Sequence, residues 1–390
     1  MTGLTTYKLL PPGNVPPDNA ATLSFHFGHQ GIGIEEAGET LPSDSLFAAL
    51  VAQAAHLDGA RLDAEGTLAF AQPFVTGTPP FVLSSLFPRL GELLLLPRPS
   101  LPLVAPEPKQ TWWDEIGKGF KKLRYLSPRL FADVCAGRPF TDAPIIMQGG
   151  KVWITPTEAA TLPKPWAQES RESPSVWRQR LAAKDHNIWE IEQVSRVTVD
   201  RVTNASAYYK VGRVTYAPGA GLAFVVRFND ATARAGFVQL LDVLAESGLG
   251  GRRSSGYGAF RWAGGPELTL DLGRPGGRAV LLSRYLPRDE ELAFLRHDHA
   301  AYKLERVGGW VYSQGRPSQR RQRIMMVTEG SVLHVGDATV RGRVEDVAPN
   351  YRKSRTPHPL FKRGAGTAHP VYRSGLALAL PIPDTKEERS

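Results

Sequence analysis

A glycine-rich stretch, "ESGLGGRRSSGYGAF" at positions 246–260, contains residue types that bind anions. Its two adjacent arginines can form charge-assisted, often bidentate hydrogen bonds with phosphate oxygens, and its two serines add hydroxyl donors. Glycines let main-chain N–H groups approach an anion without obstruction, and the tyrosine offers a ring on which a base can stack. The stretch therefore favours contact with a sugar-phosphate backbone. Its candidate residues are Gly248, Gly250, Gly251, Arg252, Arg253, Ser254, Ser255, Gly256, Tyr257 and Gly258.

Two other interpretations explain less of this stretch. A glycine helix cap followed by a tight turn accounts for two of the glycines but not for the Arg-Arg-Ser-Ser run between them. An ATP-binding loop would need a Gly-Lys-Ser/Thr ending and the order strand, loop, helix. Here the loop is expected to follow a helix and precede a strand, which is the reverse order.

The composition is that of a globular protein with a basic surface. The chain has 390 residues, a net charge of +9, 42% hydrophobic and 22% charged residues, which suits two or three domains. The positive charge fits a polyanionic partner without distinguishing nucleic acid from membrane. The single cysteine, Cys135, excludes an internal disulfide and a cysteine-rich zinc site. With no signal-like start and no apolar run of membrane-spanning length, a soluble, cytoplasmic protein is expected.

Periodic patterns predict the elements around the loop. Residues 6–11 and 22–27 read as strands, and 43–55 as a helix with Ser43 or Asp44 as its N-cap. A strand is expected at 194–203 and a hairpin at 208–228, broken at Pro218–Gly221. Residues 231–247 form the second expected helix, with a buried stripe and a left-handed cap at Gly248, and a strand follows at 257–262. The stripe consists of Phe237, Leu240, Leu241 and Leu244.

This order of strand, helix, two strands, helix and strand is that of a ferredoxin-like (RRM-like) unit in an α+β protein. It is expected over residues 1–265, split by an insertion at about 90–195 that is rich in proline and tryptophan and contains the basic stretch "GKGFKKLRYLSPRLF". The simplest role for the clustered tryptophans is the core of the insertion. Residues 266–390 are expected to form a second, degenerate unit of the same kind.

Several blocks resemble one family. "GLGGRRSSGYGAF" is similar to the signature glycine-rich loop of RAMP proteins, the RNA-binding family of CRISPR systems. "LSFHFGHQGIGIEEAGETLPSDSLFAALVAQA" resembles the N-terminal block of the Csm-type, Cas5-like subunit of type III-A effector complexes. "SLFPRLGELLLLPRPSLP", "VTVDRVTNAS" and "HPVYRSGLALAL" agree in order, so that the resemblance covers most of the chain.

The resemblance implies two ferredoxin-like domains, a β-hairpin thumb from the insertion, and no catalytic activity, metal or cofactor. The implied partners are the 5′ tag of the CRISPR RNA, the large polymerase-like subunit and the adjacent backbone RAMP subunit, in antiviral defence. Basic and polar residues outside the loop join the RNA-binding candidates on this basis: His26, Ser43, Arg196, Arg201, Lys353, Arg355 and Arg373.

Other residues leave alternatives open. His26 or His29 could serve a metal-independent endoribonuclease that processes repeat RNA, although a structural or stacking histidine is favoured. "RHDHAAY" at 296–302 contains a His-Asp pair, but further metal ligands are not evident in the sequence, and a solvated turn is favoured. The arginines of "RPSQRRQR" at 316–323 suit a solvated face and a phosphate track equally well.

Overall fold

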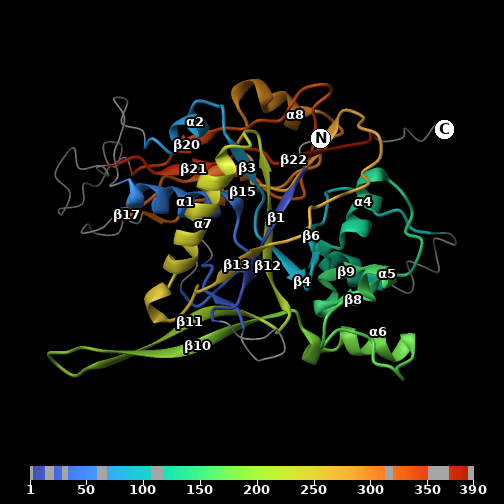
Figure 1. Ribbon diagram of the computed structural model, residues 1–390, viewed down its shortest axis with the longest axis horizontal. Coiled ribbons are helices and arrows are strands. Elements are labelled where there is room, and N and C mark those ends of the chain that lie inside the picture. Colours follow the sequence, from blue (N-terminus) through green and yellow to red (C-terminus); the bar gives the residue numbers. More distant parts are fainter. Residues whose placement is uncertain are drawn as a thin grey trace.

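The computed structural model describes residues 3–13, 22–28, 34–58, 68–106, 117–311, 319–349 and 369–384. It is a mixed α/β structure in which several antiparallel sheets are covered by a few helices (Figure 1). The α+β class expected from the sequence is therefore confirmed at this level. None of the helices in the described ranges is long and apolar enough to cross a membrane.

The central sheet is built from the N-terminal part of the chain. Its order is β13-β1-β12-β4-β5, with β3 also paired to β12, and all its pairs are antiparallel. The strand expected at 6–11 is confirmed as β1. The bounds of these strands are β1 Thr5–Leu10, β3 Phe81–Leu83, β4 Phe87–Leu90, β5 Leu93–Leu94, β12 Ala220–Phe228 and β13 Arg261–Gly264.

Two fifteen-residue helices, α1 (Ser43–Leu57) and α7 (Ala233–Ser247), accompany this sheet and contact each other. The buried stripe expected on α7 is confirmed, and Phe237 from this stripe packs 5.2 Å from the ring centroid of Tyr7 on β1. The expected N-cap of α1 is wrong. Pro42 occupies that position without a side-chain cap, because Ser43 and Asp44 are buried in contacts described below.

A long hairpin projects from the body of the molecule (Figure 1). It is formed by β10 (Trp189–Val199) and β11 (Ser206–Tyr216), and the short strand β2 (Ser24–Phe25) pairs with the base of β11. The hairpin expected within 208–228 is wrong, because β11 and β12 lie in different sheets. Most of the observed hairpin also lies after residue 195, beyond the expected insertion.

The insertion forms a small module of its own. Its four-stranded sheet has the order β6-β7-β9-β8, in which only β7 and β9 are parallel. The strands are β6 Leu96–Pro97, β7 Tyr125–Leu126, β8 Ile145–Met147 and β9 Val152–Ile154. The helices here, with α2 before them, are α2 Gln72–Val75, η1 Gly117–Lys122, α4 Pro128–Ala136, η2 Gln148–Gly150, α5 Pro156–Ala159, α6 Pro174–Ala182 and η3 Lys184–His186.

The tryptophans of this module form its core, as the sequence predicts. Trp153, Trp166, Trp177 and Trp189 are at most 5% exposed. Trp112 and Trp113 lie outside the described residues.

The C-terminal part contains one three-stranded sheet, β19-β14-β22, and three two-stranded ribbons, with helical segments of only four residues in the described ranges. Its description as a degenerate ferredoxin-like unit stays a prediction. The elements are β14 Arg278–Leu281, η5 Asp289–Leu292, α8 Ala293–Arg296, β15 Leu304–Val307, β16 Trp310–Val311, β17 Gln319–Arg320, β18 Ile324–Val327, β19 Val332–His334, β20 Val344–Asp346, β21 Tyr372–Ser374 and β22 Ala379–Ile382.

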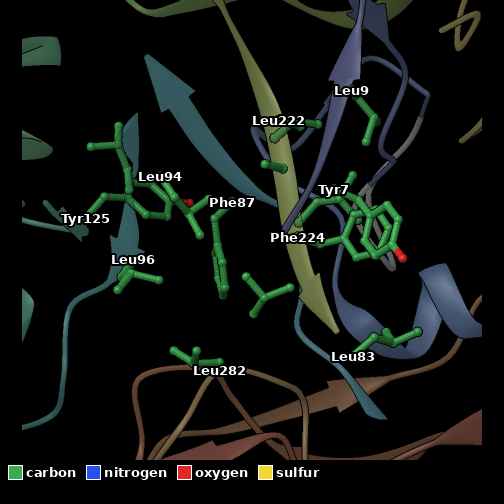
Figure 2. Close-up of a cluster of buried hydrophobic side chains, with 14 of the residues drawn as sticks. Tyr7, Leu9, Leu83, Phe87, Leu94, Leu96, Tyr125, Leu222, Phe224 and Leu282 are labelled. Atoms are coloured by element: carbon green, nitrogen blue, oxygen red, sulfur yellow. The ribbon is translucent and has the colours of Figure 1, made fainter. Parts of the chain in front are cut away.

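One large apolar cluster joins these parts. Figure 2 shows Phe224 of the central sheet, Leu96 of the insertion and Leu282 of the C-terminal part within the same group of buried side chains. Burial of apolar surface is the main stabilising contribution to such packing. The C-terminal part is therefore fixed against the N-terminal part rather than tethered to it.

Candidate nucleic-acid interface

The glycine-rich loop connects the end of α7 to β13, and its main chain is tied to the rest of the molecule. The N–H of Leu249 donates to the Gly258 carbonyl over 2.8 Å, which closes the loop on itself. The N–H groups of Gly251 and Gly258 donate to the carbonyls of His26 and Ser24 over 2.9 and 2.8 Å. These bonds hold the loop against the segment around β2.

Most of the glycines are required by the loop's own conformation. A Cβ on Gly258 would lie 2.2 Å from the Leu249 carbonyl oxygen, and a Cβ on Gly250 would lie 2.9 Å from that of His26. Gly251 faces the His26 ring at 2.8 Å in the same way, whereas Gly256 faces open space. Gly248 ends α7 with φ +77° and ψ 163°, so the expected cap has positive φ but not the left-handed helical conformation. A side chain at Gly250, Gly251 or Gly258 would therefore collide with neighbouring residues, whereas one at Gly256 would not.

The outward-facing part of the loop is short and polar. Arg253, Ser254, Ser255 and Gly256 are exposed, and η4 (Arg253–Ser255) forms a single turn there. Nη1 of Arg253 donates to the Ser247 carbonyl at the end of α7 over 3.2 Å. This places one guanidinium and two hydroxyls side by side on the surface.

Two cation–aromatic contacts connect the loop to the hairpin. Nη2 of Arg196 on β10 donates to the Tyr257 hydroxyl over 3.0 Å, and this bond raises the pKa of Arg196. The guanidinium of Arg252 lies 5.5 Å from the ring centroid of Tyr209 on β11. Arg252 holds a left-handed conformation with φ +58°, which is uncommon for a residue other than glycine. The loop and hairpin thus present one cationic surface.

Tyr257 does not have the position expected for base stacking. Its side chain is only 4% exposed, so its ring face is not open to a base. On the hairpin, Tyr208 is 62% exposed, and its hydroxyl lies 2.8 Å from Ser195 Oγ. Of the tyrosines at this surface, Tyr208 has the accessible ring.

Three other candidates are buried in the protein interior. Nδ1 of His26 lies 2.7 Å from the Gly212 carbonyl oxygen, and the residue is 7% exposed. The Ser43 hydroxyl accepts from the Arg284 N–H over 2.9 Å. Arg373 pairs with Asp44 and donates to the Gly308 carbonyl over 2.6 Å. The polar atoms of Ser43 and Arg373 serve contacts between α1 and the C-terminal part, so this structure does not present them to an RNA.

Of the remaining RNA-binding candidates, one is exposed and two lie outside the described residues. Arg201 is exposed in the turn at the tip of the hairpin, five residues from Arg196 and so roughly 16 Å further along the hairpin. Lys353 and Arg355 lie outside the described residues, as does His29.

The described part of the 316–323 arginine run contacts β16. The Arg320 guanidinium lies 5.0 Å from the Trp310 ring centroid, and Nε of Arg321 donates to the Trp310 carbonyl over 3.0 Å. Burial lowers the pKa of Arg321 to about 10. Arg321 therefore belongs to the packing of this ribbon.

A second cationic region was not predicted as a site. A cavity of about 1010 Å³ lies between the insertion and the C-terminal part. Its cationic lining consists of Arg98, Lys121, Lys122, Arg124, Lys151, Arg284 and Lys303.

Glu305 and Glu329 also line this cavity, and both form ion pairs with Arg284. Arg284 lies 2.7 Å from Glu305 and 3.6 Å from Glu329. Lys121 and Lys122 come from the basic stretch noted in the sequence, which was the available signal. What the sequence could not indicate is that the C-terminal Lys303 lies at the same cavity.

Residues 275–382 match the family model of the CRISPR Csm4 C-terminal domain. This part of the chain is therefore similar to the C-terminal domain of Csm4. None of the curated proteins matches it.

Solved structures extend the Csm4 likeness to nearly the whole chain. A chain of the Csm3–Csm4 subcomplex in the type III-A CRISPR-Cas interference complex is 16% identical with a TM-score of 0.59, over 97% of this chain and all of that one. Chains of the Csm1–Csm4 cassette in complex with cA4 and with pppApA are each 17% identical with a TM-score of 0.50, over 98% of this chain and 99% of the other. At these identities the likeness shows the fold. The resemblance to the Csm-type RAMP subunit is confirmed.

Proposed function

We propose that this chain is a non-catalytic subunit of a type III-A CRISPR ribonucleoprotein. In this role it binds the repeat-derived 5′ tag of the CRISPR RNA and anchors the large polymerase-like subunit for RNA-guided antiviral defence. The proposal implies a cytoplasmic protein that needs no cofactor.

The observation that carries the RNA part is the joined surface of loop and hairpin on a Csm4-like fold. Arg252, Arg253 and Arg196 lie on it together with two exposed serine hydroxyls. Arginines bind phosphates through paired N–H groups, and exposed tyrosine rings stack on bases in single-strand binders. The surface therefore has the groups that a bent single strand requires.

The cationic cavity adds a second anion-binding region. Lys121, Lys122 and Lys151 line it without an ion pair in the described chain, whereas Arg124 is paired with Glu39 at 2.7 Å. Unpaired cations facing a cavity are available to a polyanion. We propose that the RNA contacts this cavity as well as the loop.

The partners follow from the likeness. Its relatives are found with Csm3 in a type III-A subcomplex and with Csm1 in a cassette. We propose that this chain likewise contacts a backbone RAMP subunit and a large polymerase-like subunit. Co-purification with each partner tests this separately from RNA binding.

The finer fold assignment also belongs to the proposal. The order β13-β1-β12-β4 with α1 and α7 as the two long helices is that of a ferredoxin-like unit. We propose this unit for residues 1–265, interrupted by the insertion at about 90–195, and a degenerate second unit for 266–390.

The test of RNA binding uses a double variant of the loop. Fluorescence anisotropy of labelled 5′-tag RNA should show about tenfold or greater weakening for Arg252→Ala/Arg253→Ala, since each loses a charge-assisted hydrogen bond. Because each phosphate contact to a single strand contributes about 0.7 to the slope of log affinity against log salt, the slope should fall by about 1.4.

The matched control is Arg171→Ala/Arg178→Ala, which removes the same charge from the insertion away from both cationic regions. Its salt slope should stay that of the unaltered protein. If the loop variant and this control lost equal affinity, the loop would not be a binding site, and the proposal would fail.

An endoribonuclease that uses His26 loses its structural support, whereas His29 lies outside the described residues. A general base must reach its substrate, but the His26 ring is buried and bound to the Gly212 carbonyl. Incubation with repeat RNA in the absence of metal should give no cleavage. Cleavage that disappears in His26→Ala would replace the scaffold role by the nuclease role.

A further inference from the structure

Three histidines that are distant in the sequence meet on the C-terminal part. His297 and His299 lie in the turn after α8, and His334 ends β19. One ring nitrogen of each lies within 4.8 Å of those of the other two. In the sequence only the His-Asp pair of "RHDHAAY" was evident, without the further ligands that a metal site requires.

The backbone around the cluster is fixed by several hydrogen bonds. The N–H groups of Ala301 and Val332 each donate to the other's carbonyl, over 2.9 and 2.8 Å, which locks the turn to β19. The N–H of Ala300 donates to the His297 carbonyl over 2.9 Å and closes the turn. The three Cα positions are therefore held by regular structure, and only the imidazole side chains need to move for a ligand.

The rings are close enough to converge on one ion. His297 and His334 are stacked with centroids 3.6 Å apart, and the ring of His299 lies 5.1 Å from that of His297 at 67°. A tetrahedral zinc site with Zn–N bonds of about 2.0–2.1 Å spaces its nitrogens about 3.3–3.4 Å apart. The ligand atoms already lie within 4.8 Å of one another, so the site requires a rotation of the exposed His297 ring that opens the stacked pair.

Two imidazole nitrogens of the cluster make at most one weak hydrogen bond within the described part of the chain. Nδ1 of His334 is buried and has no hydrogen-bond partner in the described part of the chain. A buried polar atom without a partner is unfavourable, so the protein gains if a ligand or a shift of the ring provides one. Nδ1 of His297 accepts only a 3.2 Å bond from the His299 N–H, which requires the unprotonated nitrogen that a metal also requires.

The charge around the cluster suits a cation. Oδ1 of Asp384, just after β22, lies 3.9 Å from Nδ1 of His299. The same oxygen lies 3.6 Å from Nε of Arg278, the residue paired with His334 across β14 and β19. The Asp384 carboxylate thus lies between the Arg278 guanidinium and the histidines. Its negative charge would offset the positive charge of a bound metal ion.

We propose that His297, His299 and His334 bind one divalent transition-metal ion of the zinc class. Imidazole nitrogen is a preferred ligand of zinc, cobalt and nickel, and three histidines leave one position for water or a carboxylate. Bound there, the ion ties the turn after α8 to the end of β19. The site is independent of the RNA-binding surface and does not rest on the proposed function.

The test uses the full chain without a polyhistidine tag, stripped of metal by a chelator and dialysed. Calorimetric titration should show one equivalent of Zn²⁺, and Co²⁺ should give the intense visible absorption of a tetrahedral ion. His297→Gln, His299→Gln and His334→Gln should each weaken Zn²⁺ binding by more than about tenfold, whereas His56→Gln, an exposed histidine on α1, should not. Zn²⁺ should raise the melting temperature of the unaltered protein and of the His56 variant only.

Circular dichroism establishes that each variant is folded before it is titrated. Zn²⁺ binding that needs millimolar metal, or that is equal in the unaltered protein and in any of the three variants, would overturn the site. Binding of several equivalents that all four histidine variants share would show nonspecific surface binding and would also overturn it.

Discussion

The buried ion pair between Asp44 on α1 and Arg373 on β21 gives a prediction that separates stability from RNA binding. The two side chains are 1% and 3% exposed. Replacing Arg373 by methionine keeps much of its volume but leaves the Asp44 carboxylate in the interior without its cation. Breaking one partner of such a pair costs about 3–5 kcal/mol, because the remaining charge stays desolvated.

The expected size of the effect follows from the chain length. Unfolding entropy near the melting temperature is about 2.1 cal/mol/K per residue, or about 0.8 kcal/mol/K for the 390 residues if they unfold together. A loss of 3–5 kcal/mol then lowers the melting temperature by about 4–6 °C. Thermal unfolding followed by circular dichroism measures it for Arg373→Met beside the unaltered protein.

A double variant and an RNA titration complete this test. Asp44→Asn/Arg373→Met removes both charges, so it should lose less stability than the sum of the two single variants. At temperatures where Arg373→Met is folded, its salt slope for 5′-tag RNA should equal that of the unaltered protein. Unchanged stability together with a reduced salt slope would show that Arg373 contacts RNA, and the assignment made from its burial would be wrong.

Two further predictions concern the loop and the cysteine. Gly258→Ala should lower the melting temperature more than Gly256→Ala. Both glycines have φ near +85°, but only a Cβ at position 258 would lie 2.2 Å from a carbonyl oxygen. Equal losses of melting temperature in thermal unfolding would contradict this close approach. Burial raises the pKa of the Cys135 thiol, so little thiolate forms at pH 8. A colorimetric thiol reagent should therefore react with Cys135 only after denaturation. Rapid reaction of the native protein would contradict the burial of this thiol.

The helices and the class of the fold could be predicted because their signals are local. The apolar stripe of α7 repeats at helical spacing, and its buried residues are those expected. Strand pairing is not a local property. Alternation identified strands on both sides of Pro218–Gly221 but did not show that β11 and β12 enter different sheets. The sequence does contain a turn-favouring residue at the observed turn, Asp200. Its Oδ1 accepts from the N–H groups of Val202 and Thr203, as aspartate side chains do in turns.

The surroundings of several candidate site residues could not be predicted from the sequence. Residue type suggested solvent exposure for Ser43 and Arg373, whereas both are buried by partners far along the chain, 329 residues away for the pair of Arg373 with Asp44. His334 of the histidine cluster and Lys303 of the cavity were missed because each meets its neighbours only through the fold. A site whose residues come from several strands can be recognised only once the fold is known.

The structure also changes the reason for the glycines. They were expected to expose the main chain to phosphate, yet the N–H groups of Gly251 and Gly258 are occupied by carbonyls of the β2 segment, and a Cβ at either position would collide with the protein. Their function is to let the loop fold tightly enough to hold Arg252, Arg253 and the two serines beside the hairpin. If RNA is bound here, the charge of these side chains must supply the affinity. Glycine substitutions should then act through stability, and arginine substitutions through the salt dependence of binding. A Gly258→Ala protein that stayed folded and lost RNA affinity without a change in salt slope would return the main chain to the role that the sequence first suggested.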